Sequence, residues 1–174
     1  MKKSSAYGIQ CVNRCAIWTT FLLMLSAPIS HAQDASCKAV VEASNLMART
    51  ANHSYSTQVS AGRSTETESI SMPTGIYWKA AGVWHTSKTA FQQNSQDTVE
   101  ANHSLTDCRQ LGDEVVNGEP TIVYSEVNKQ SGGKGKLWVS KKSGLPIRTE
   151  VMSGSTRITS RIEYGNVQAP STAK

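Results

Sequence analysis

The sequence predicts a mainly β fold of the α+β class, a curved antiparallel meander with an N-terminal helix packed on its concave face. Two observations predict it. Between Leu111 and Val167, short β-type runs alternate with turns almost without interruption, and such spacing pairs each strand with its neighbour in sequence. Ahead of that series, residues 36–49 carry the one clear helical pattern. A sheet with an apolar face needs a cover, and this helix is the available one.

The turns in the C-terminal series separate the predicted strands. Asn117-Gly118 accepts positive φ at both central positions and predicts a tight hairpin after Val115-Val116. Further turns are predicted at residues 131–135, at residues 143–146 and at Gly154. The strands predicted between these turns cover residues 121–127, 136–141, 147–153 and 156–164.

The N-terminal half begins with the helix and continues in strands. Ser36 is a suitable helix cap, and apolar residues recur at helical spacing from Ala39 to Met47. Asn52 ends this pattern. The predicted strands that follow cover residues 53–60, 76–79, 83–86 and 99–105, with a short strand ending at Ile70 and Met72. Residues 63–68 are expected to form a hairpin loop or an exposed edge, and residues 91–96 a loop or one helical turn.

The C-terminal strands show one apolar face and one charged face, because alternate residues of a strand point to opposite sides. The apolar parity contains Leu137, Val139, Ile147, Val151, Ile158, Ile162 and Tyr164, and the charged parity contains Arg148, Glu150, Arg157, Arg161 and Glu163. A single helix rarely hides a whole sheet of eight or more strands. The uncovered remainder of the apolar face is predicted to form a groove or cavity.

Residues 1–32 have the pattern of a secretory signal peptide. Three basic residues precede an apolar run at residues 16–25, and Ser30-His31-Ala32 fits a signal peptidase site. Cleavage there leaves residues 33–174, 142 residues that suit a single domain. The apolar run is too short for an ordinary membrane span, so no stable span is expected after cleavage. We predict export to the periplasm of a Gram-negative bacterium.

The charge of the exported chain is lower than the whole sequence indicates. Without the three basic residues of the signal peptide, 15 Lys and Arg remain against 13 Asp and Glu, a net charge of +2. The pI of about 9.1 therefore does not indicate a nucleic-acid partner.

The exported chain retains two cysteines, Cys37 and Cys108. An even pair in an oxidising compartment favours one disulfide. Two alternatives are buried free thiols and a lipidated Cys37. The lipidated form has little support because Asp34-Ala35-Ser36 precedes the cysteine and no leucine stands where a lipobox has one.

The segment from Cys108 to Pro170 resembles the LolA/LolB-like superfamily of periplasmic lipoprotein carriers, whose fold also forms the sensor domain of RseB. The resemblance rests on residues 111–118, 122–124, 137–140 (Leu-Trp-Val-Ser), 142–148 (Lys-Ser-Gly-Leu-Pro-Ile-Arg) and 164–167 (Tyr-Gly-Asn-Val). It implies an incomplete β-barrel whose concave side is covered by helix and binds acyl chains or other apolar ligands.

The resemblance and the strand parity together predict a non-enzymatic periplasmic protein that holds a lipid, acyl chain or other hydrophobic ligand in a half-barrel cavity. Seven side chains are predicted to line the site: Trp84, Tyr124, Leu137, Val139, Val151, Ile158 and Ile162. Trp138 has the opposite parity to Leu137 and is expected as an exposed stacking platform among cations. Alternatively, the aromatic side chains fill a closed core.

A second hypothesis is an envelope protein-interaction or stress-sensing module that uses the same sheet without a bound lipid. The partner classes are therefore a hydrophobic ligand or lipid and a lipoprotein or other envelope protein, and the sequence does not define the oligomeric state. No cofactor is predicted. A metal site at His53, His85 and His103 is not favoured, since no His-x-His pair occurs. Hydrolase chemistry is also not favoured, because a Gly-x-Ser-x-Gly motif is absent.

Overall fold

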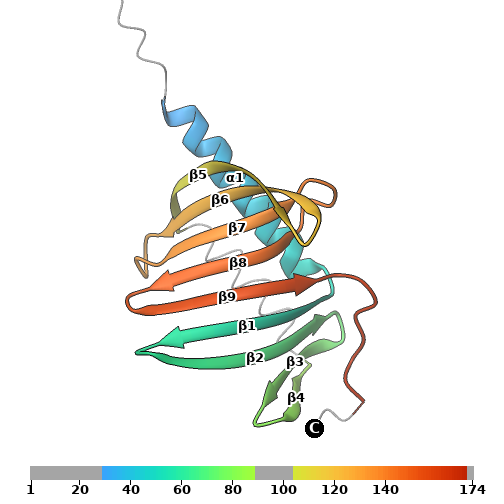
Figure 1. The fold of residues 1–174 in the computed structure, drawn as a ribbon. Coiled ribbons are helices and arrows are strands. Elements are labelled where there is room, and N and C mark those ends of the chain that lie inside the picture. Colours follow the sequence, from blue (N-terminus) through green and yellow to red (C-terminus); the bar gives the residue numbers. More distant parts are fainter. Residues whose placement is uncertain (1–28, 89–103, 172–174) are drawn as a thin grey trace, which may run out of the picture.

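The computed structural model describes residues 29–88 and 104–171, which form one helix and one large sheet (Figure 1). Helix α1 covers Ile29–Arg49. The strands are β1 (Asn52–Ser60), β2 (Arg63–Met72), β3 (Gly75–Ala80), β4 (Val83–Ser87), β5 (Leu105–Val116), β6 (Glu119–Asn128), β7 (Lys134–Ser140), β8 (Pro146–Ser153) and β9 (Thr156–Glu163). The sheet is antiparallel with the order β4-β3-β2-β1-β9-β8-β7-β6-β5. The predicted fold class is confirmed.

The sheet consists of two meanders, β1–β4 and β5–β9, joined where β1 pairs with β9. Within the described residues, β4 and β5 are its two edges, so the barrel is not closed. We call the side that carries α1 the helix face and the opposite side the outer face. Figure 1 shows the helix crossing behind the sheet, with the outer face towards the viewer.

The predicted hairpins have the expected turn geometry. Asn117 and Gly118 have φ values of 52° and 83°, which suits a two-residue turn with positive φ at both positions. Residues 63–68 belong to β2; residues 63–67 are an exposed edge, one of the two expected outcomes, whereas Glu68 is half-buried and pairs with β3. The predicted elements at residues 91–96 and 99–103 lie outside the described residues.

The helix begins earlier than predicted, at Ile29 instead of Ser36, so Ser36 is not its cap. The residues between them contain neither glycine nor proline, and Pro28 comes directly before the helix. No helix-breaking residue therefore separates Ile29 from Ser36, and the helix extends over both. The predicted cleavage position at Ala32 falls within α1 and remains a prediction.

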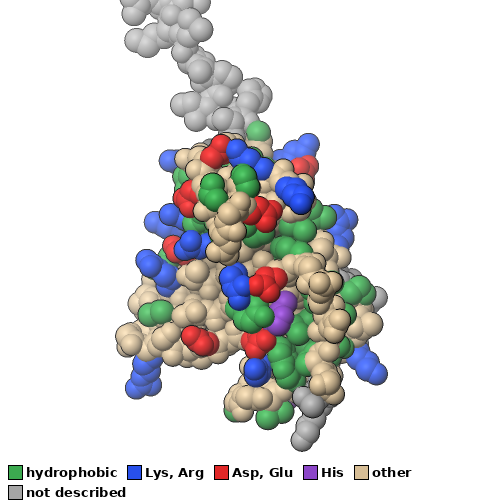
Figure 2. Space-filling view, turned by 45° about the vertical axis from the view of Figure 1, so that its right-hand side comes forward, with side chains coloured by type: hydrophobic (Ala, Val, Ile, Leu, Met, Phe, Trp, Pro, Cys, Tyr) green, Lys and Arg blue, Asp and Glu red, His purple; other side chains and the backbone are tan. Residues whose placement is uncertain are grey.

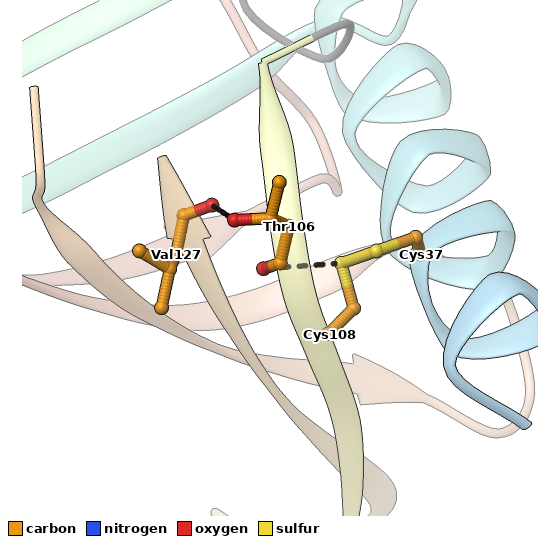
Figure 3. The surroundings of a disulfide bond; sticks show 4 residues. All are labelled: Cys37, Thr106, Cys108 and Val127. Atoms are coloured by element: carbon orange, nitrogen blue, oxygen red, sulfur yellow. Dashed lines mark hydrogen bonds between the residues drawn. A yellow bond between two sulfur atoms is a disulfide. The ribbon is translucent and has the colours of Figure 1, made fainter. Parts of the chain in front are cut away.

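The helix is fastened to the sheet by the predicted disulfide between Cys37 and Cys108, whose Cα atoms are 4.9 Å apart (Figure 3). Cys108 is fully buried. Its strand β5 shifts register twice against β6, next to Asp107 with φ of 51° and Gly112 with φ of 144°. Such bulges bend a strand, and here they turn Cys108 towards the helix. Val40 and Ala43 of the helix pack beside the disulfide in the core.

A second attachment lies at the Gly144-Leu145-Pro146 turn of the resemblance motif. The side chain of Leu46 on α1 lies near Gly144, 3.7 Å from where a Cβ atom would stand. Gly144 has φ of 72°, and its N–H donates to the Ser140 carbonyl over 2.9 Å. The hydroxyl of Tyr164 donates to the Pro146 carbonyl over 2.6 Å. Leu46 therefore brings the helix against this turn, and the two hydrogen bonds fix the turn to β7 and to the segment after β9.

Removing the disulfide is expected to destabilise the protein strongly. The two cysteines are separated by 71 residues, and closing a loop of that length contributes about 4 kcal/mol in the chain-entropy treatment. The variant Cys37→Ser/Cys108→Ser should therefore have a lower urea midpoint than the oxidised wild type. Wild type in reducing agent should match the variant; a midpoint unchanged in both would contradict the role of the disulfide.

Candidate functional site

The helix covers only the β5–β8 part of the helix face. Side chains from α1 and from these strands form the core there, with Val40, Ala43, Cys108, Tyr124, Leu137 and Val139 as its buried members. Three residues predicted to line a ligand site, Tyr124, Leu137 and Val139, are thus occupied by packing against the helix. Burial, and to a lesser extent the charge of Asp113, raises the pKa of Tyr124. This half of the face is filled.

The other half of the helix face, over β1, β2 and β9, carries small polar side chains. Strand register shows this directly: Ser54 lies opposite Ser69 and Ile162, and Ser56 lies opposite Thr67 and Ser160. The Ser56 and Ser160 hydroxyls are 2.7 Å apart. Every second residue of β1 and β2 points to this face, and several of these residues are serines or threonines. The surface is therefore more polar than the aliphatic lining that the sequence predicted.

A cavity of about 300 Å³ lies where the end of the helix meets this open half. Its apolar lining is Met47, Ala48, Ile76 and Ile162, and its polar lining is Asn52, Ser54, Ser69, Ser71, Thr149 and Ser160. The Asn52 amide donates to the Thr50 carbonyl over 2.9 Å, which fixes the chain leaving the helix. The Ser71 hydroxyl oxygen is buried without a hydrogen-bond partner among the described residues. The cavity is therefore amphiphilic.

The remaining predicted lining residues have different positions. Ile162 lines the cavity. Val151 and Ile158 face each other across β8 and β9 on the helix face, outside the cavity lining, and Val151 is 39% exposed. Whether any of these side chains contacts a ligand remains a prediction.

Trp84 is not part of the inner wall, and its predicted orientation is wrong. It lies opposite Lys79, whose ammonium is 5.6 Å from the centre of the Trp84 indole, and beside His53 on the outer face. The helix face instead carries Trp78, which lies opposite Ser69 and stacks on His85. Trp78 is 42% exposed beside the cavity. Trp78 and Ile76 share a parity in β3, but the assignment of that parity to the helix face follows from strand register.

Trp138 is buried, so the expectation of an exposed platform is wrong. Only 5% of its surface is exposed. The long strand β5 brings Glu114 over the outer face, and its carboxylate accepts a hydrogen bond of 2.7 Å from the Trp138 indole. The predicted stacking with a cation does occur, because the Arg148 guanidinium lies 4.5 Å from the ring centre.

The outer face of the β1–β4 half carries a connected group of polar and aromatic side chains. The Glu68 carboxylate bonds His53 Nε2 over 2.9 Å and Lys79 Nζ over 3.1 Å. Burial opposes ionisation of Glu68, but these two contacts prevail and lower its pKa. The Tyr55 ring stacks on His53, and the Arg161 guanidinium lies over the Tyr55 ring, 4.4 Å from its centre. In Figure 2, a histidine lies among acidic, basic and apolar side chains.

The three histidines considered as metal ligands do not converge. His53 lies on the outer face and His85, stacked on Trp78, on the helix face, while His103 lies outside the described residues. Residues 29–88 and 104–171 contain no group of three or more potential ligand residues for a metal ion. Over the same residues, no helix combines the length and apolar character needed to cross a membrane.

No family model matches this chain, and no curated protein matches its sequence. Among solved structures, the lipoprotein LppX of Mycobacterium tuberculosis is similar, with a TM-score of 0.54 and 11% identity over 79% of this chain and 99% of that chain. LprF of Mycobacterium bovis gives 0.49 and 9% over 82% and 100%. A LolA-superfamily protein of Nitrosomonas europaea gives 0.31 and 9% over 73% and 91%.

These likenesses concern the fold. The fold that the resemblance implied, an open, mainly β sheet with an N-terminal helix, is present in the described residues, and LppX is similar to it in fold. Sequence identity is too low for any residue of the site to be transferred.

One buried carboxyl on the helix face is expected to make stability depend on pH. Burial raises the pKa of Glu126, and its Oε2 has no hydrogen-bond partner among the described residues. The folded protein therefore retains this proton at pH values where the unfolded chain has lost it, and stability falls as pH rises through that window. Glu126→Gln should raise the melting temperature at pH 7 and lose this advantage towards pH 4. An advantage of equal size at both pH values would contradict the buried-carboxyl account.

Proposed function

We propose that this protein is a non-enzymatic binding protein of the cell envelope that holds the apolar part of a lipid, acyl chain or other amphiphilic ligand in the cavity at the end of α1. The observation that carries the proposal is the cavity itself. It lies on the half of the helix face that α1 does not cover, and it combines Met47, Ile76 and Ile162 with serine and threonine hydroxyls.

The size and lining of the cavity favour one end of an amphiphile. A volume of about 300 Å³ is at the lower end for pockets that enclose a small molecule, so the rest of a long ligand would extend over the open half of the sheet. Burying about 200 Å² of apolar ligand surface contributes roughly 5 kcal/mol. The hydroxyls of Ser69 and Ser71 supply hydrogen bonds to a polar group at the boundary.

The same lining favours binding over catalysis. Its residue types are methionine, alanine, isoleucine, asparagine, serine and threonine, none of which ionises near neutral pH. General acid–base catalysis needs a group whose pKa is near the working pH, and the cavity lining does not supply one. The signal-peptide pattern and the Cys37–Cys108 disulfide support an exported, oxidising location.

The two tryptophans of the β3–β4 hairpin, one on each face of the sheet, provide a matched test of ligand position. Trp78 lies on the helix face beside the cavity, whereas Trp84 lies on the outer face. Titration with dodecanoate or hexadecanoate should change tryptophan fluorescence in the wild type and in Trp84→Phe. The change should be largely lost in Trp78→Phe, because the reporter beside the ligand is then absent.

A cavity-filling variant tests the same site without fluorescence. Ser69→Phe should weaken fatty-acid binding at least tenfold, and Thr65→Phe, on the same face of β2 but outside the cavity lining, should bind like the wild type. Native mass spectrometry of protein from the periplasm should show a bound lipid. If no lipid co-purifies and no fatty acid changes the fluorescence, the proposal is wrong.

The second candidate, an envelope protein-interaction module, is favoured by one specific observation. Strand β2 is longer than its pairing with β3 and leaves part of its edge without a partner strand among the described residues.

A further inference from the structure

The sheet has a step at β2. This strand covers Arg63–Met72, but β3 pairs only with its second half, from Glu68 to Met72. Residues 63–67 therefore have β1 on one side and no described strand on the other. All five side chains are exposed. The step is this free part of β2, a short strand edge that lies between the two ends of the sheet. It is separate from the outer edges at β4 and β5.

The hairpin geometry fixes which backbone groups are available at this edge. Ala61 and Gly62, with φ values of 49° and 76°, form a two-residue turn closed by Ser60 and Arg63. In such a hairpin the closing pair exchanges hydrogen bonds, and every second pair does the same. The intervening residues Ser64 and Glu66 thus direct their N–H and C=O groups away from β1, to the free side.

An open groove of about 540 Å³ lies next to this edge. Its lining comes from three neighbouring strands and the β3–β4 turn: Tyr55, Ser56, Thr57, Glu66, Thr67, Glu68, Lys79, Ala81 and Gly82. Glu68 is already bonded to His53 and Lys79. Glu66 has the same side-chain direction, is exposed, and has no ion-pair partner among the described residues.

We propose that residues 63–67 of β2 accept an extended segment of a partner protein as an added strand, with a Lys or Arg side chain of that segment lying in the groove against Glu66. Backbone pairing to Ser64 and Glu66 would provide affinity, and the side-chain pocket would provide selectivity. The basic residue follows from charge complementarity, because Glu66 is the lining carboxylate without a cation.

The regularity of this edge distinguishes it from the outer edge at β5. Edge strands are commonly protected by prolines, bulges or lysines. Strand β5 has two register shifts and the disulfide at Cys108. Residues 63–67 pair with β1 in unbroken register and contain no proline or lysine, so they present a regular template.

A displayed library of random seven-residue peptides, selected against the full exported protein, tests the proposal without knowledge of the partner. The selected peptides should be enriched in Lys or Arg, flanked by β-forming residues. Their binding should fall at least tenfold in Glu66→Pro, which removes an outward N–H while leaving the β1 pairing intact. It should fall two- to fivefold in Glu66→Gln, the range of one cross-strand charge pair.

Two control variants locate the effect. Thr86→Pro places a proline in the outer strand β4, and Glu150→Gln removes a carboxylate from the outer face of β8; both should bind the selected peptides like the wild type. Thermal melts of each variant check the fold.

Four results would overturn the proposal, three of them from the peptide library. These three are a library without binders, binding that survives Glu66→Pro, and binding lost in Thr86→Pro instead. A dimer of the wild type that dissociates in Glu66→Pro would show that a second copy of the chain occupies the edge, which also contradicts a partner protein. None of these outcomes affects the fatty-acid titration, since the cavity is on the other face.

Discussion

The structure depends on a mismatch between one helix and a wide sheet. Nine strands about 4.8 Å apart span roughly 38 Å, whereas a 21-residue helix is about 30 Å long and about 10 Å across. The helix therefore covers part of one face, and its points of attachment decide which part. The Cys37–Cys108 disulfide holds it at β5, and the contact of Leu46 with the Gly144 turn holds it near β8. The cavity lies where this cover ends.

The two halves of the helix face differ because their strands differ in composition. Beneath the helix, β6 and β7 supply Tyr124, Leu137 and Val139 to a close-packed core. Beyond it, β1 and β2 supply serines and threonines at the equivalent positions. Small hydroxyls tolerate water, so this half of the sheet does not have to be packed by the one described helix. An amphiphile suits such a boundary better than a purely apolar ligand, because both parts of it find matching surface.

Much of the fold was predictable from local signals. Three predictions were confirmed: the Asn117-Gly118 turn, the alternation in β7–β9 and the disulfide. The first two depend on residues close in sequence, and the third depends on the oxidising compartment. Trp138 shows what strand parity alone could not predict. Its parity correctly placed it away from the helix, but its burial depends on Glu114 and Arg148 from two other strands. Trp84 shows another limit, since parity within one strand does not say which face the helix occupies. Register across β1, β2 and β3 is needed for that assignment.

The family motif and the candidate site lie in different parts of the chain, and this separation has a physical reason. Gly144 requires positive φ, Pro146 receives the Tyr164 hydroxyl, and Leu46 packs on the turn. In this chain the turn is therefore a place where the helix meets the sheet. The cavity and the β2 edge are built largely from residues 47–82, which the motif does not constrain. The residues that carry the resemblance thus lie at the helix attachment, whereas the proposed binding surfaces depend on the composition of β1, β2 and β3.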